Sequence, residues 1–148
     1  MLSRLRHLAF LALRPMTLGV RVAAFDVAGR IFLVRHTYVA GWHLPGGGVD
    51  PGESIEAAAL REMAEEGNLT ALAPLRLVSV HFNRAASRRD HVVLYACDHA
   101  VQSAPHAPDR EIAESGFFPP DSLPEGVTPA TLRRLAELRA EAPSSPLW

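Results

Sequence analysis

Three glutamates near the middle of the chain have the spacing expected of a metal site. Glu62, Glu65 and Glu66 are three and four residues apart, so on a helix their carboxylates project from one side. Like charges at i,i+4 repel by about 0.2–0.5 kcal/mol per pair, and acids in a last turn face the negative end of the helix dipole. Bound Mg²⁺ or Mn²⁺ removes this conflict, because carboxylate oxygens are hard ligands that also leave room for substrate phosphates.

A helix over residues 55–66 is predicted to carry these carboxylates. Ser54 is a favourable N-cap, and no proline interrupts the helix. Apolar residues fall on two opposite sides, which is typical of a helix packed between other elements. The alternative is a solvated acidic helix end. It fits poorly, because the glutamate side is apolar one turn earlier, at Ile55 and Ala59.

Strand and helix signals alternate along the rest of the chain. Residues 18–27 and 30–38 predict a hairpin around an Ala28–Gly29 turn. Further strands, rich in β-branched and large apolar residues, are predicted over 75–82, 91–99 and 111–118. A last helix is predicted to begin at Thr128 as N-cap, with Pro129 at its first position. This order of elements indicates an α/β protein.

The stretch from Gly47 to Leu69 resembles the Nudix box of the Nudix hydrolase family, written G-x5-E-x7-R-E-U-x-E-E-x-G-U with U aliphatic. Glu53 and Arg61 fall at their fixed positions, and the three glutamates follow. One position departs, because Asn68 stands where the family has its last glycine. Asn is the residue best able to replace Gly in a left-handed helix cap, so the departure is mild.

The resemblance implies a fold and a set of roles. The fold is a Nudix-type α/β/α sandwich around a mixed β-sheet, expected here as one domain over 1–148 with an N-terminal helical extension (1–16) and a loose tail (143–148), in which Trp148 is the candidate exception. The expected metal ligands are the backbone carbonyl of Gly47 and the carboxylates of Glu62, Glu65 and Glu66, one of which often assists in activating water. Glu53 and Arg61 match a structural pair that braces the loop and helix.

The implied reaction is metal-dependent hydrolysis of the pyrophosphate linkage of a nucleoside diphosphate joined to another group, with water attacking phosphorus. The base varies in this family, and the candidates are Glu114 and Glu111, with Asp98 weaker. A non-catalytic Nudix-like domain that senses a nucleotide or mediates an interaction is the alternative. ADP-ribose, dinucleoside polyphosphates, nucleotide sugars and nucleoside triphosphates all remain open as substrates, because specificity resides outside the box.

Several residues outside the box are candidates for substrate binding. His43 directly precedes the glycine loop, and a polar loop offers three arginines suited to phosphate: Arg84, Arg88 and Arg89. Such a loop more often serves only solubility. Three aromatic side chains could stack on a base but are expected in the core: Trp42, Phe82 and Tyr95.

Composition narrows the class of protein. A net charge of −1 gives no reason to expect general nucleic-acid binding. A small nucleotide is the partner that the Nudix resemblance implies. Cys97 is the only cysteine, which excludes an intrachain disulfide. The apolar run in 1–16 is too short to span a membrane and lacks a signal cleavage site, so a cytoplasmic location is expected. The run predicts a helix over residues 2–13, packed on the domain or on a second subunit, which leaves a homodimer open. A membrane-surface helix is the alternative.

Overall fold

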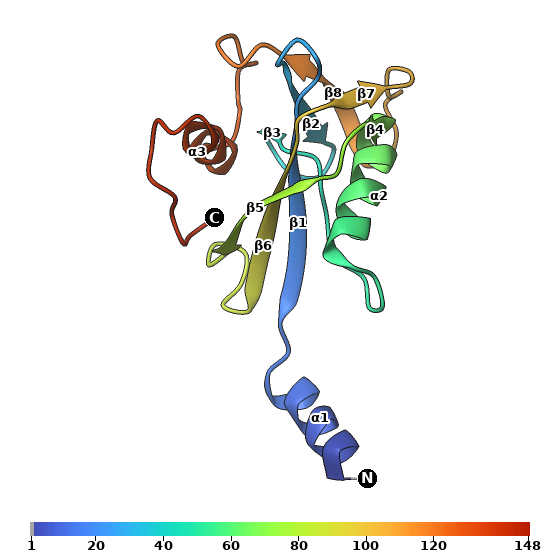
Figure 1. Cartoon of the computed structure of the whole chain (residues 1–148), viewed down its shortest axis with the longest axis vertical. Helices are drawn as coiled ribbons and strands as arrows, with labels where there is room; N and C mark the ends of the chain where they lie inside the picture. The colour runs from blue at the N-terminus through green and yellow to red at the C-terminus, as the bar shows by residue number, and fades with distance from the viewer. Residues whose placement is uncertain (1) are drawn as a thin grey trace.

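The computed structural model describes residues 2–148, with side chains from residue 6 onward. Its elements, in chain order, are α1 (Leu2–Leu13), β1 (Thr17–Ala24), β2 (Ile31–His36), β3 (Trp42–His43), α2 (Ile55–Gly67), β4 (Leu69–Ala71), β5 (Arg76–Phe82), β6 (Asp90–Cys97), β7 (Ala100–Gln102), β8 (Ile112–Phe118) and α3 (Pro129–Leu138). Figure 1 shows the strands lying between α2 and α3, with α1 projecting from one end.

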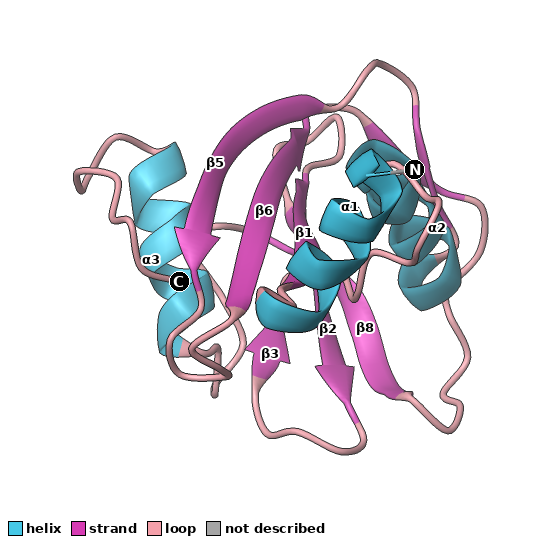
Figure 2. Cartoon of the chain, turned by 90° about the horizontal axis from the view of Figure 1, so that it is seen from below, coloured by secondary structure: helices cyan, strands magenta, loops and turns pink. Residues whose placement is uncertain are grey.

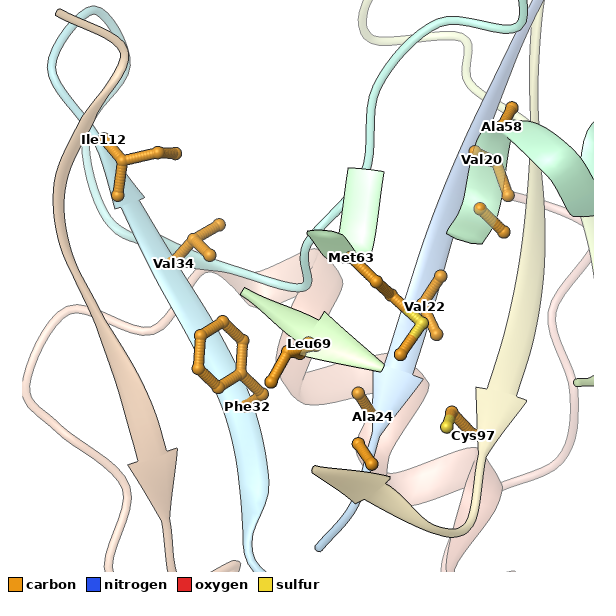
Figure 3. Close-up of a cluster of buried hydrophobic side chains, with 12 residues drawn as sticks. Val20, Val22, Ala24, Phe32, Val34, Ala58, Met63, Leu69, Cys97 and Ile112 are labelled. Carbon is orange, nitrogen blue, oxygen red and sulfur yellow. The ribbon is translucent and has the colours of Figure 1, made fainter. Parts of the chain in front are cut away.

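The strands form three small sheets in the orders β1-β6-β5, β3-β2-β8 and β4-β7. Since β1 runs parallel to β6 while β5 runs antiparallel to it, the first sheet is mixed. Two apolar clusters lie on its two sides. One joins Val20 and Val22 to Met63 of α2, as Figure 3 shows, and the other joins Ala23 to Leu135 of α3. The predicted α/β/α layering is therefore confirmed.

The predicted hairpin is wrong beyond its turn. Gly29 has a φ of 74°, and a single bridge, Phe25 to Ile31, links β1 to β2 before they enter different sheets. The reason is that both edges of β1 are already used. One edge pairs along its whole length with β6, and the other binds the glycine loop, whose Gly47 carbonyl accepts from the Val20 N–H at 2.9 Å.

The box helix α2 begins and ends as its sequence predicts. The Ser54 hydroxyl accepts from the Ala57 N–H at 3.1 Å. At the other end Asn68 is left-handed, with φ 54° and ψ 34°, and its N–H donates to the Ala64 carbonyl at 3.0 Å. Asn68 thus supplies the positive φ for which the family pattern has glycine.

The tail after α3 is bonded to the domain, so the prediction of a loose tail is wrong. The Phe82 N–H donates to the Pro146 carbonyl at 2.8 Å, and the Trp148 N–H donates back to the Phe82 carbonyl at 3.1 Å. From α3, the fully buried Arg134 donates to the Leu147 carbonyl at 2.9 Å. Composition did not reveal this, because the partners come from β5 and α3.

Helix α1 forms where the sequence predicts, but it does not pack on its own domain. Figure 1 shows it standing apart from the sheets, and Figure 2, which views the chain from below, shows it in front of them. Its described apolar side chains are exposed, including Leu8, Phe10, Leu11 and Leu13. Packing on a second subunit or on a membrane surface stays a prediction. Within residues 2–148, none of the helices has the length and apolar character needed to cross a membrane.

Candidate active site

Arg61 ties the glycine loop to the carboxylates of α2. Its guanidinium donates to both oxygens of Glu53, at 2.9 and 3.0 Å, and to the Gly48 carbonyl at 3.0 Å. The remaining nitrogen donates to Glu62 at 2.7 Å and, more weakly, to Glu65 at 3.3 Å. These bonds raise the pKa of Arg61 and hold that of Glu53 below its usual range. Loop and helix end are therefore braced by one cation.

Glu66 is held rigidly from two other elements. The buried Nε2–H of His36, at the end of β2, donates to one carboxylate oxygen at 2.7 Å. The Gly46 N–H donates to the other oxygen at 2.8 Å. Both partners are donors, so they stabilise the ionised carboxylate, and each oxygen keeps a further lone pair for another ligand.

Gly47 lies directly against the Glu62 carboxyl group. A Cβ at Gly47 would stand 2.8 Å from the Glu62 carboxyl carbon, so only glycine permits this approach. Burial raises the pKa of Glu62, and the charges of Glu66 and Glu65 add to this, while Arg61 opposes it. A partly buried carboxylate beside two others favours a nearby cation.

A cavity of about 290 Å³ opens on the other side of the same loop. It is lined by the first half of β1, by Gly47 and Gly48, by Asn83 and Asp90 at facing ends of β5 and β6, and by Trp148. Gly47 is shared, because it lines the cavity and also contacts Glu62. A ligand in the cavity therefore lies one residue away from the carboxylates.

Comparison with known proteins identifies the family. The NUDIX domain pattern matches residues 15–138, which is most of the chain. The chain belongs to the Nudix hydrolase family. The box matched in the sequence is therefore the Nudix box, and Arg61, Glu62, Glu65 and Glu66 of α2 are among its residues.

Nudix proteins similar to this chain come from several organisms. An RNA pyrophosphohydrolase of Gluconobacter oxydans is 47% identical over an alignment of 58 residues that covers 35% of this chain and 34% of that protein. An 8-oxo-dGDP phosphatase of Mus musculus is 35% identical over 100 residues, covering 68% of this chain and 30% of that protein. The chain thus spans about a third of the curated relatives it matches. A crystal structure of a MutT NUDIX hydrolase from Burkholderia pseudomallei has a TM-score of 0.69 and 27% identity, over 82% and 97% of the two chains.

The Nudix box glutamates are not gathered around one point in this conformation. Across residues 6–148, no group of three His, Cys, Asp or Glu side chains is arranged to hold an ion. Yet the donor set fits a hard divalent cation: it offers carboxylate oxygens, and Arg61 already lies between Glu62 and Glu65 as a positive charge. Metal binding would need these two carboxylates to turn from Arg61, which its two bonds to Glu53 keep in place.

The structure does not bring Glu114 to the Nudix box. On β8 it pairs opposite Arg35 of β2 and bonds to that guanidinium at 2.8 Å. Glu114 and Phe118 are four residues apart on β8 and therefore lie on the same face of the strand. Phe118 packs against the apolar cluster that contains Leu135 of α3, so this face is turned towards α3. Glu111 directly precedes β8, and its backbone carbonyl accepts from the Thr37 N–H at 2.8 Å, one residue after His36. Burial raises the pKa of Tyr38, and the negative charges of Glu66, Glu111 and Glu62 raise it further, while Arg21 opposes them.

The other candidates divide between the two sides of the glycine loop. His43 is half-buried, with its ring 5.5 Å from that of His36, and its Nε2–H donates to the Ala40 carbonyl. The exposed loop residues Arg84, Arg88 and Arg89 lie in the sequence between Asn83 and Asp90, which both line the cavity. Of the aromatic candidates, Trp42 is buried in the α3 cluster, Tyr95 packs on the α2 cluster, and Phe82 lies 5.4 Å from His91.

Sequence reasoning missed the residues that support Glu66 and the cavity. His36 is an isolated histidine after a buried apolar run, and its spacing carries no ligand signal. Asn83 and Asp90 are drawn together only by the turn between β5 and β6 and by the register of Thr17 with Asp90. Trp148 at the end of a Pro- and Ser-rich tail is the one residue whose type gave a hint.

Proposed function

We propose that this protein is a divalent-metal-dependent hydrolase, which cleaves the pyrophosphate linkage of a nucleoside diphosphate joined to another group. One observation carries the proposal: Gly47 contacts the Glu62 carboxyl group and also lines the cavity. This contact supports the proposal, because it sets the negatively charged carboxylates beside a space suited to the organic part of a nucleotide.

The chain's own residues have distinct parts in this reaction. Glu62, Glu65 and Glu66, with the Gly47 carbonyl, would hold Mg²⁺ or Mn²⁺. When bound, the cation neutralises phosphate charge and lowers the pKa of water. His36 and the Gly46 N–H fix Glu66, so that this carboxylate does not move when the substrate arrives. Arg61 keeps Glu62 close to the glycine loop through its bonds to Glu53.

A base must take the proton of the attacking water. Glu111 suits this part better than Glu114, since its backbone is bonded to Thr37, next to the His36 that holds Glu66, while Glu114 is paired to Arg35. Glu111 is exposed and precedes β8, so it can approach a bound substrate without disturbing the core. Glu111→Gln should lower turnover while leaving the melting temperature unchanged.

The names of the relatives support this reaction class without fixing the substrate. They include RNA pyrophosphohydrolases, a putative 8-oxo-dGTP diphosphatase and, among solved structures, an ADP-ribose pyrophosphatase. All cleave or are named for a phosphate anhydride of a nucleotide. A panel containing nucleoside di- and triphosphates, ADP-ribose, nucleotide sugars and dinucleoside polyphosphates therefore covers the candidates.

The test is hydrolysis of each substrate in this panel, either with an excess of Mg²⁺ over substrate or with EDTA. Each product is identified by chromatography. Carrying out the reaction in ¹⁸O-labelled water shows which phosphorus is attacked, because the label enters that product. We expect at least one substrate to be cleaved into two products, each carrying a phosphate from the broken linkage, and only when metal is present. Tight nucleotide binding with no hydrolysis of any substrate would favour the non-catalytic alternative.

A further inference from the structure

We propose that the cavity beside Gly47 binds a guanine base, with Trp148 as the stacking surface and Asn83 and Asp90 as the groups that recognise its edge. This assignment rests on the proposed function for its substrate class, but it concerns binding and can be tested without turnover. It identifies specificity residues that lie entirely outside the Nudix box.

The cavity is built into the face of the β1-β6-β5 sheet that α3 covers only in part. Thr17 and Gly19 of β1 line it beside Asp90 and Val92 of β6, which are their register partners. Gly19 leaves this space free, because a Cβ there would stand 3.5 Å from the Gly47 carbonyl oxygen and 3.8 Å from Val92 Cγ2. The φ of Gly19 is not positive, so the backbone conformation does not require glycine here. The effect of glycine is to leave room in the cavity.

Arg21 also lines the cavity, and its guanidinium donates to the Leu44 carbonyl at 2.9 Å. At the end of the cavity formed by Asn83 and Asp90, the side-chain oxygens are hydrogen-bond acceptors. Asp90 is fixed at both oxygens, by the Thr17 hydroxyl at 2.6 Å and by the Asn83 amide N–H at 2.8 Å. With its amide nitrogen turned to Asp90, Asn83 has its carbonyl oxygen left as an acceptor. Each Asp90 oxygen also retains a lone pair. The base that fits must carry adjacent donors on one edge.

Guanine is the nucleobase that meets this requirement best. Its N1–H and 2-amino group place two donors side by side, whereas adenine and cytosine offer one amino group next to an acceptor nitrogen. A site that bonds to donor groups rejects analogues lacking them, because its own polar groups are then left unpaired. Hypoxanthine, which lacks only the 2-amino group, is therefore the sharpest comparison.

Trp148 is held in place before any ligand binds. Its ring lies 5.3 Å from the Arg134 guanidinium and 5.5 Å from the His81 ring, and its backbone bonds to Phe82. Aromatic rings fixed in this way stack on any base, so Trp148 should supply affinity, while Asn83 and Asp90 supply the choice of base.

The size and position of the cavity set the orientation of the nucleotide. Its volume of about 290 Å³ is at the low end of ligand pockets, which span about 300–1,000 Å³, so it suits a base with part of its sugar. The phosphates would then leave past Gly47 and Gly48 towards Glu62.

The test is calorimetric titration of the full chain with GDP, IDP, ADP and CDP in EDTA, where metal-dependent hydrolysis is blocked. We expect GDP to bind at least tenfold more tightly than each of the others. Equal affinities for GDP and IDP would overturn the assignment. If GDP binds selectively but no substrate is hydrolysed with metal, the cavity assignment stands and the hydrolase proposal fails. If hydrolysis occurs but the four nucleotides bind alike, the reverse holds.

Variants separate the parts of the site, each checked first by its melting curve. Gly19→Val should fill the cavity and raise the Kd for GDP at least tenfold, and valine suits a strand. Trp148→Leu should weaken all four nucleotides together, while Trp148→Phe should restore most of the loss. Asp90→Asn should bring GDP and IDP within about twofold, with the exposed Asp121→Asn as its matched control. Unchanged GDP binding by a folded Gly19→Val would place the base elsewhere.

Discussion

Asn68 offers a direct test of how the Nudix box ends its helix. With φ 54° and ψ 34° it occupies the left-handed region, where a side chain with Cβ costs about 1–2 kcal/mol. Asn offsets part of this cost, since its side-chain amide donates to the Ala104 carbonyl at 3.2 Å. A partly exposed bond of this kind contributes about 0.5–1 kcal/mol.

These terms predict different changes in stability for two substitutions. Asn68→Gly removes the strain but loses the side-chain bond and gains about 0.4–1 kcal/mol of unfolded-chain entropy, so the net change should be near zero. Asn68→Val loses the bond and places a β-branched side chain in the left-handed region, for a loss of about 2–3 kcal/mol. At about 2–4 °C per kcal/mol for a chain of this size, the melting temperature should fall by roughly 5–10 °C.

Thermal melts and urea titrations of both variants measure the difference, with Thr70→Val as a control at an exposed position two residues away. The folded Asn68→Val protein should also lose turnover, because the cap sets the last turn, which carries Glu65 and Glu66. Equal stability of the Val and Gly variants would refute the left-handed cap.

The remaining predictions concern two positions of the glycine loop and the pH dependence of stability. Gly47→Ala should keep a near-normal melting temperature, since a Cβ there meets the side chain of Glu62, but should lower turnover more than about tenfold; Gly46→Ala should unfold the protein, because its Cβ would meet the backbone of Val20 at a φ of 147°. Burial, aided by the Arg134 charge, lowers the pKa of His81 in the folded protein. Below about pH 6.5 the unfolded chain therefore binds more protons than the folded chain, and the free energy of unfolding decreases as the pH is lowered. When the pH is lowered from 8 to 5, the melting temperature should therefore fall less steeply for His81→Gln than for the natural chain. Parallel curves of melting temperature against pH would contradict the buried, uncharged histidine.

Local signals in the sequence predicted the box helix and its caps. Ser54, Asn68, Thr128 and Pro129 each act through bonds or dihedral angles within a few residues, so their types alone indicate the outcome. The spacing of the glutamates likewise follows from helix geometry. The Nudix resemblance added the fold, which the matches to solved structures confirm.

Contacts between distant segments were beyond such signals. The hairpin was expected because 18–27 and 30–38 are adjacent, but the glycine loop and β6 compete for the edges of β1 and win. His36 reaches Glu66 across 30 residues, and Trp148 reaches β5 across more than 60. The divergence of Glu62 and Glu65 towards Arg61 also depends on rotamers, which helical spacing does not determine.

The most direct test of the central claim is the turnover of Glu66→Gln on the best substrate of the panel, measured with saturating Mg²⁺. Glutamine keeps the shape of the side chain but removes a charge from the proposed metal ligands, so turnover should fall by more than about 100-fold, beyond the loss typical of residues that only support a ligand. Glu56→Gln, an exposed change on the same helix, should retain activity and the same melting temperature. A folded Glu66→Gln protein with activity close to that of the natural chain would contradict the claim that these glutamates hold the catalytic cation.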